Sequence, residues 1–321
     1  MATDRARRCL ARGSGQGLGQ GLARGLGRAA LAAGLVAACV TPGMAAQLQL
    51  PALVEPASQD HHVGKVIFLE LVTPDIAAAK QFYAGLFGWQ FRDSQDGVIK
   101  YAAASLDGRP VAGLIQREIP AGEHRQPAWL GFLSVRDVDA ATTNASQHGA
   151  KLLFGPRDFP DRGREAVIAD PQGAVFAVLA SSSGDPPDVM AVPGQWIWSS
   201  LITSDPDTDA AFYQAVFGYD VYDLPAAEGA EHLLLASDSY ARASVNSLPV
   251  KGPDRHPYWL NFVRVEDTVK MTAKAVALGG RVLVEPRVDR HGGRVAVVAD
   301  PLGAPFGLLE WPSTESKEVP R

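Results

Sequence analysis

The chain has 321 residues, of which 46% are hydrophobic and 20% are charged, so it is long enough and apolar enough for about two ordinary domains. The formal net charge of −5 at pH 7 provides no basic surface for nucleic acid, so no nucleic acid partner is expected. The two cysteines, Cys9 and Cys39, lie near the N-terminus. The remaining chain therefore has no disulfide, no thiolate nucleophile and no cysteine metal ligand.

Residues 1–39 have the pattern of an export signal. Six arginines precede an apolar run at residues 29–38, which is too short to span a bilayer but suits a signal peptide. The run ends in Val-Ala-Ala-Cys, which resembles a bacterial lipobox with Cys39 as the lipidated residue. We predict export to the cell envelope and a membrane anchor at Cys39, followed by a linker at residues 40–62. An ordinary signal cleaved after Ala45 or Ala46 is the alternative, and both the Sec and the twin-arginine routes stay open.

The rest of the chain repeats itself with a shift of 130 positions. Matching pairs include Phe82/Phe212, Tyr83/Tyr213, Trp129/Trp259, Gly163/Gly293, Asp170/Asp300 and Phe176/Phe306. A register held over more than a hundred residues indicates a duplication. It predicts one domain at residues 63–181, a linker at 182–194, a second domain at 195–312 and a C-terminal tail at 313–321.

Each copy contains the same order of elements twice. Apolar periodicity predicts a strand at 65–73, a helix at 74–88 and strands at 89–93, 99–106 and 109–117. The second half of the copy then predicts a strand at 128–135, a helix at 137–149 and strands at 150–154, 164–169 and 174–180. The pattern is β-α-β-β-β, twice in each copy and four times in the chain.

Each copy ends with the motif Asp-Pro-x-Gly between two strands, at Asp170 and at Asp300. An aspartate before a rigid turn resembles a metal ligand or a general base. The three residue types are, however, those that a type I turn prefers. We therefore interpret Asp170 and Asp300 as structural turn residues.

The runs around Phe82–Gly88 and the Asp-Pro-x-Gly endings resemble the vicinal oxygen chelate superfamily, which contains glyoxalases, bleomycin-resistance proteins and extradiol dioxygenases. Its two-domain bacterial glyoxalase-like branch is the most similar. The resemblance covers residues 65–180 and 196–311, and it implies an α+β fold in which four βαβββ modules form two tandem domains. In the family, each pair of modules forms a cleft that binds a metal ion or a ligand.

The same resemblance implies where metal ligands would lie. These positions are Phe68, Leu130 and Ala177 in the first copy and Trp198, Leu260 and Gly307 in the second. None of these side chains is a metal ligand, so we predict no metal and no other cofactor. The histidines are poor candidates for replacement metal ligands. They are expected in or beside loops, as for His232, or on the polar end of a helix, as for His148. His256, just before a predicted cleft strand, is retained as a candidate ligand-binding residue.

Strand alternation places Glu70 on the face of Phe68, and Ser200 on the face of Trp198. Glu70 is the one ionisable group of an apolar strand, so it must find donors, become protonated or face water. The candidate ligand-binding residues are therefore Phe68, Glu70, Leu130, Trp198, Ser200, His256 and Leu260. Trp129 and Trp259 are either cleft walls or core residues, with the core favoured, and Glu310 is expected in solvent at a strand end.

Three functions stay open. A metal-free module that binds a small-molecule ligand is favoured. The second is an enzyme, namely a lyase, isomerase or dioxygenase with displaced ligands, or an acid–base catalyst that uses Glu70. The third is an envelope scaffold without a small-molecule function. The identity of the ligand and the oligomeric state do not follow from the residues.

Overall fold

The computed structural model describes residues 50–94, 99–118, 126–224, 232–248, 256–288 and 293–311. The predicted signal, including Cys39, and the tail after residue 311 lie outside these ranges. Within the described ranges, no helix combines the length and the apolar character needed to cross a membrane.

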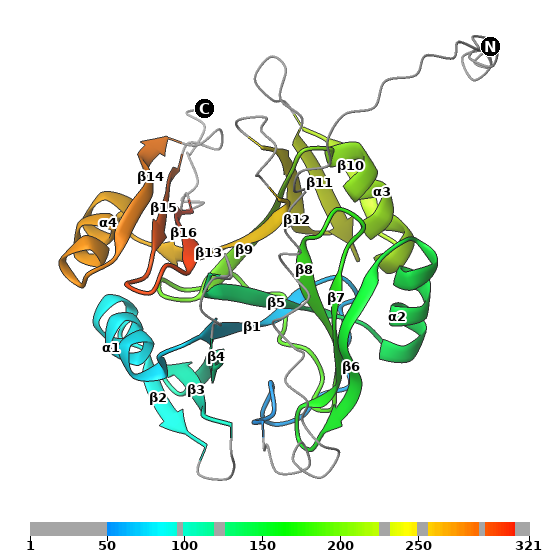
Figure 1. The fold of residues 1–321 in the computed structure, drawn as a ribbon, viewed down its shortest axis with the longest axis horizontal. Helices are drawn as coiled ribbons and strands as arrows, with labels where there is room; N and C mark the ends of the chain where they lie inside the picture. Colours follow the sequence, from blue (N-terminus) through cyan, green and yellow to red (C-terminus); the bar gives the residue numbers. More distant parts are fainter. Residues whose placement is uncertain are drawn as a thin grey trace, which may run out of the picture. The chain divides into compact units, whose positions relative to one another are not determined.

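Four βαβββ modules follow one another along the chain, as the sequence predicts (Figure 1). The first domain consists of β1 (Val66–Thr73), α1 (Ile76–Phe87), β2 (Gln90–Asp93), β3 (Tyr101–Leu106), β4 (Arg109–Gln116), β5 (Ala128–Ser134), α2 (Val138–Gln147), β6 (Lys151–Phe159), β7 (Gly163–Ala169) and β8 (Val175–Ser181). The second consists of β9 (Trp196–Thr203), α3 (Pro206–Phe217), β10 (Asp220–Asp223), β11 (His232–Ser237), β12 (Tyr240–Ser247), β13 (Tyr258–Val265), α4 (Thr268–Ala277), β14 (Arg281–Val288), β15 (Arg294–Ala299) and β16 (Pro305–Glu310).

Each domain forms one eight-stranded mixed sheet. The strand order is β2-β3-β4-β1-β5-β8-β7-β6 in domain 1, and domain 2 repeats it as β10-β11-β12-β9-β13-β16-β15-β14. The first strands of the two modules, β1 and β5, pair antiparallel at the centre of the sheet. Each of them also pairs in parallel with the last strand of its own module. The fold class predicted from the sequence is therefore confirmed.

The helix boundaries follow from residues that the two copies share. Asp75 precedes α1 and its carboxylate accepts hydrogen bonds from the backbone N–H groups of Ala77 and Ala78. Gly88 ends α1 in the left-handed conformation, with φ of 77°, which glycine adopts without strain. Asp205 and Gly218 begin and end α3 in the same way. These repeated residues are thus accounted for by helix capping.

The helices of one domain share apolar cores with strands of the other. Phe82 and Tyr83 of α1 pack against Phe306 of β16, with ring centroids 6.2 and 5.6 Å apart. In the mirrored contact, Tyr213 of α3 packs against Phe176 of β8 at 5.3 Å. The two cores lie on the helical side of both sheets. We call the other side of each sheet, whose apolar clusters contain no helical residue, the inner face.

The repeated Asp-Pro-x-Gly ending joins the two domains. In each copy one carboxylate oxygen of the aspartate accepts backbone N–H groups of its own turn, as predicted. The second oxygen accepts the hydroxyl of a tyrosine from the other domain: Tyr213 donates to Asp170 at 3.0 Å, and Tyr83 donates to Asp300 at 3.2 Å. Each tyrosine oxygen also accepts the indole N–H of a core tryptophan of its own domain, at 2.9 Å. The motif is therefore a buried structural element, which explains why it occurs twice.

The 130-residue register is not constant throughout. Glu70 of β1 pairs with Gly113 of β4, whereas Ser200 of β9 pairs with Ser244 of β12. Ser244 therefore takes the place of Gly113 with a shift one residue larger than 130, and His232 likewise takes the place of Tyr101. The prediction of a repeat without gaps is wrong for β11 and β12. A shift of 130 positions does not align their side chains with the equivalent ones of β3 and β4.

Candidate functional site

The inner face of domain 1 has an apolar floor. The floor consists of Ile67, Phe68, Phe132, Val167, Ala177 and Leu179, with Leu130 partly buried beside it. Phe68 and Phe132 meet edge to face, with centroids 5.8 Å apart. The predicted candidates Phe68 and Leu130 thus lie together on this face.

Four polar side chains form a group on this floor, which we call the carboxylate–arginine cluster: Glu70, Tyr101, Arg162 and Glu165. Arg162, in the turn between β6 and β7, is only 1% exposed, and its guanidinium carbon lies 4.0 Å from the centre of the Phe68 ring. Its Nη2 lies 3.5 Å from the Tyr101 hydroxyl, in position to donate to it. Glu165 is buried, and its Oε2 has no hydrogen-bond partner. A buried carboxylate oxygen without a donor is costly, so Glu165 is able to bind a further donor group.

Burial raises the pKa of Glu70 to about 7 and the pKa of Glu165 to about 8, although the charge of Arg162 lowers both. The charge of Glu70 raises the pKa of Glu165 further. At neutral pH Glu165 therefore keeps its proton, while Glu70 is divided between its acid and its base form. A carboxyl group with these properties can act as a general acid or a general base.

The inner face of domain 2 carries two tryptophans, Trp198 and Trp311. The floor consists of Leu260, Phe262 and Leu309, and the partly buried Ile197, Trp198, Ile202, Val295, Val297 and Trp311 pack against it. The Trp198 and Trp311 rings lie 6.4 Å apart, at an interplanar angle of 38°. The predicted candidates Trp198 and Leu260 thus lie together on this face.

Small polar groups surround the hydroxyl of Ser244 beside Trp198. This oxygen accepts the indole N–H of Trp198 at 3.1 Å and the amide of Asn246 at 3.0 Å, and it lies 2.8 Å from the hydroxyl of Ser200. These groups can donate to, or accept from, a polar ligand without carrying charge. Ser200 is the predicted candidate, whereas Ser244 and Asn246 were missed because the register shift hides their position.

The two inner faces differ at both carboxylate positions. Glu70 is replaced by Ser200 in domain 2, and Glu165 by Val295, which occupies the same register on β15. Three members of the cluster were not predicted from the sequence. Arg162 and Glu165 lie in and beside a turn, and Tyr101 lies in a short strand. The available signal was the difference between the copies, the same signal that singles out Glu70.

The positions that the resemblance assigned to metal ligands do not fit a metal ion. A side-chain atom on Gly307 would lie 1.9 Å from the Phe262 ring, so that ring fills the space a ligand would need. In domain 1 the guanidinium of Arg162 lies over Phe68 and would repel a cation. In the described part of the chain, no three His, Cys, Asp or Glu side chains come together as a metal-binding group.

The other residues considered in the sequence have structural places. The rings of Trp129 and Trp259 lie in the helix-side cores, so the core interpretation holds. Glu310 does not project freely into solvent as expected, because its carboxylate accepts the backbone N–H of Thr268 at 2.6 Å where α4 begins. His232 is buried at the start of β11 rather than in a loop. His256 lies half-buried immediately before β13, outside the groups described above.

Two family models match the chain, one in each domain. The model described as Glyoxalase/Bleomycin resistance protein/Dioxygenase superfamily matches residues 61–178, and the model described as Glyoxalase-like domain matches residues 199–309. The chain belongs to the glyoxalase/bleomycin resistance protein/dioxygenase superfamily. This membership agrees with the resemblance seen in the repeated motifs.

Curated members of the superfamily match most of the chain. A glyoxylase-named protein of Mycobacterium tuberculosis, CFP32, is 32% identical over 257 residues, which cover 79% of this chain and 98% of that protein. The anthracycline biosynthesis protein DauV of Streptomyces sp. (strain C5) is 34% identical over 259 residues, which cover 77% and 93%. The chain therefore resembles both relatives over almost their whole length.

Solved structures of the superfamily share the fold at low identity. The Mn(II)-bound glyoxalase from Novosphingobium aromaticivorans has a TM-score of 0.56 and 18% identity, covering 78% of this chain and 83% of that one. Homoprotocatechuate 2,3-dioxygenase from Brevibacterium fuscum has a TM-score of 0.57 and 14% identity, covering 84% and 77%. These similarities concern the fold alone.

Proposed function

We propose that this superfamily member is an exported, metal-independent small-molecule-binding protein. The observation that supports the proposal is that the positions expected to hold metal ligands are apolar, and that neighbouring groups fill the space beside them. The ring of Phe262 fills the space over Gly307, and the guanidinium of Arg162 lies over Phe68. A divalent ion would have to displace an aromatic ring in one domain and a buried cation in the other.

The ligand lies on the inner face of domain 2. Two features support this choice: the rings of Trp198 and Trp311 are only partly buried, and neutral polar groups centre on Ser244. Aromatic side chains bind flat rings by stacking, and hydroxyl and amide groups fix the orientation of polar substituents. The ligand class is therefore a flat aromatic molecule with hydroxyl or carbonyl oxygens. The relatives named for anthracycline biosynthesis support an aromatic ligand of this kind.

Quenching of tryptophan fluorescence by a dihydroxyanthraquinone tests this function. We expect saturable binding, and Trp198→Leu is expected to weaken it by about fivefold or more, because one stacking partner contributes about 1 kcal/mol or more. Phe68→Leu, at the same position of domain 1, is the matched control and should leave the affinity unchanged. Loss of binding in Phe68→Leu with normal binding in Trp198→Leu would move the ligand to domain 1.

A second candidate function is acid–base catalysis by Glu70. The supporting observation is that burial raises the pKa of Glu70 to about 7, which suits proton transfer at neutral pH. Metal-independent turnover of a 2-oxoaldehyde, abolished in Glu70→Gln, would establish this function. Equal turnover by the wild type and the variant would remove it.

The export part of the proposal depends on residues 1–39 and concerns Cys39. A lipid-anchored envelope protein should fractionate with membranes and should become soluble in the Cys39→Ala variant. If the wild type and the variant fractionate alike, Cys39 is not an anchor.

A further inference from the structure

The inner face of domain 1 is covered by a segment of the same chain. Residues 50–62, which we call the cap segment, precede β1 and were expected from the sequence to be a linker. Leu53 is 6% exposed and packs in the apolar floor with Phe68 and Phe132. Leu50 is 4% exposed and packs with Tyr101. The side chain of Leu53 is therefore buried against the floor, and that of Leu50 is buried beside the carboxylate–arginine cluster.

The cap segment also satisfies the cluster's cation. The Nε of Arg162 donates a hydrogen bond of 2.9 Å to the backbone carbonyl of Pro51, which lies between the two leucines along the chain. A buried guanidinium needs such acceptors, because it carries five donors and an unpaired charge is costly to bury. The face thus receives a carbonyl oxygen flanked by two branched apolar side chains.

The residues that follow β8 hold the cap segment in place. The hydroxyl of Ser183 accepts the backbone N–H groups of Leu53 and Val54 at 3.0 and 3.1 Å, and its carbonyl accepts that of Ser58 at 2.9 Å. The carboxylate of Asp185, which is 1% exposed, accepts the backbone N–H of His62 at 2.6 Å. These hydrogen bonds hold the cap segment by its backbone and do not depend on its side chains.

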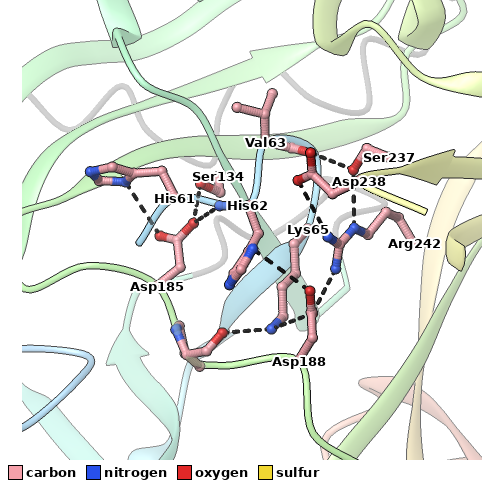
Figure 2. Close-up of polar contacts among 11 residues, drawn as sticks. His61, His62, Val63, Lys65, Ser134, Asp185, Asp188, Ser237, Asp238 and Arg242 are labelled. Carbon is pink, nitrogen blue, oxygen red and sulfur yellow. Dashed lines mark hydrogen bonds and ion pairs between the residues drawn. The ribbon is translucent and has the colours of Figure 1, made fainter. Parts of the chain in front are cut away.

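Figure 2 shows how this attachment continues into domain 2. Asp185 also accepts the hydroxyl of Ser134 at 2.5 Å, at the end of β5 (Figure 2). Asp188, three residues later, lies 2.8 Å from the ammonium of Lys65 and 2.6 Å from the guanidinium of Arg242. Arg242 lies on β12, and its Nε also donates a hydrogen bond of 3.0 Å to the hydroxyl of Ser237. One set of polar contacts therefore joins the cap segment, the connection between the domains and β12 of domain 2.

Domain 2 has no equivalent of this arrangement among its described residues. Every member of its inner-face cluster comes from its own strands, apart from Trp311, which follows β16 directly. The carboxylates of the cluster beside the cap segment are replaced in the second copy, where Glu165 and Glu70 become Val295 and Ser200. The charged cluster and its cover thus belong to domain 1 alone.

We infer that the inner face of domain 1 is a second binding site, whose resident occupant is the cap segment. The site takes a peptide-like ligand that presents a carbonyl oxygen to Arg162 and branched apolar groups to the floor on either side. Release of the cap segment opens this site without opening domain 2.

Thiol labelling measures whether the cap segment covers this face. A reporter cysteine is placed at Leu130→Cys or at Leu260→Cys, the same position of the two domains, in the full chain with Cys9→Ser and Cys39→Ser. The cap segment is released by Leu53→Asp, because an unpaired carboxylate in the apolar floor is unfavourable. Ser183→Ala, which removes an acceptor of two backbone N–H groups, is the milder second variant.

Release is expected to increase the rate of alkylation at position 130 by about tenfold or more, because the cap segment no longer closes over the cysteine. The rate at position 260 should change by less than about twofold. An unchanged rate at position 130 in both release variants would show that the cap segment does not cover this face. Equal acceleration at both positions would show a general loss of structure instead, and it would also overturn the inference.

A synthetic peptide of residues 50–62 then tests the ligand class on the Leu53→Asp chain. The peptide should slow alkylation at position 130 again, and a peptide carrying the same aspartate should not. Protection by both peptides, or by neither, would refute the assignment of a peptide-like ligand.

Discussion

Replacing Glu70 by glutamine changes how the stability of the protein depends on pH. Burial raises the pKa of Glu70 from 4.5 to about 7, so the folded state binds a proton that the unfolded state releases at lower pH. The sign follows from linkage: this contribution to stability is fully present below about pH 4.5, decreases as the pH rises, and is lost above about pH 7. The rise in pKa corresponds to about 3 kcal/mol of unfolding free energy.

Glutamine at position 70 has no proton to lose. Between pH 4.5 and pH 8 the wild type should therefore lose about 3 kcal/mol more stability than the Glu70→Gln variant does. The variant should also lower the pKa of Glu165, because the charge of Glu70 is one cause of its elevation to about 8. Both effects make the variant comparatively more stable in alkaline solution.

Urea unfolding at pH 5 and at pH 8 measures this difference, with the exposed Glu266→Gln as the control for a surface glutamate. A free-energy difference between the wild type and Glu70→Gln that is the same at both pH values would contradict this prediction. That result would mean that Glu70 is already stabilised as an anion by donors around it.

Two further changes test the contacts between and within the domains. Tyr83→Phe leaves the indole N–H of Trp129 and a carboxylate oxygen of Asp300 without their shared partner, so it should cost about 2 kcal/mol or more in urea unfolding. Tyr213→Phe should cost a similar amount, and a change in either variant below about 0.5 kcal/mol would contradict the role given to this hydroxyl. Glu310→Ala should destabilise the protein by about 1 kcal/mol, because the carboxylate satisfies a backbone N–H at the start of α4; a neutral effect would show that water replaces it.

The sequence predicted the fold because the fold depends on local patterns repeated four times. Aspartate before each first helix, glycine after it and alternating apolar strands are signals read within a few residues, and the duplication showed each of them twice. Asp170 was interpreted correctly as a turn residue. Its bond with Tyr213 was not predictable, because that contact joins residues 43 positions apart, in different domains.

The candidate site was only partly predictable, for the same reason. Glu70 stood out as a single carboxyl group in an apolar strand, whereas its neighbours Arg162 and Glu165 lie in ordinary turn and strand sequences. What makes them notable is burial and mutual proximity, and these arise from the tertiary structure. The cap segment has the composition of a linker, and only its packing of Leu50 and Leu53 distinguishes it from one.

We propose that this superfamily member binds its ligand without a metal ion. The direct measurement is the metal content of protein purified without an affinity tag, together with dihydroxyanthraquinone binding before and after treatment with a chelator. We expect no stoichiometric metal and the same affinity in both preparations. Stoichiometric zinc, nickel, manganese or iron, with binding abolished by the chelator and restored by the metal, would contradict it.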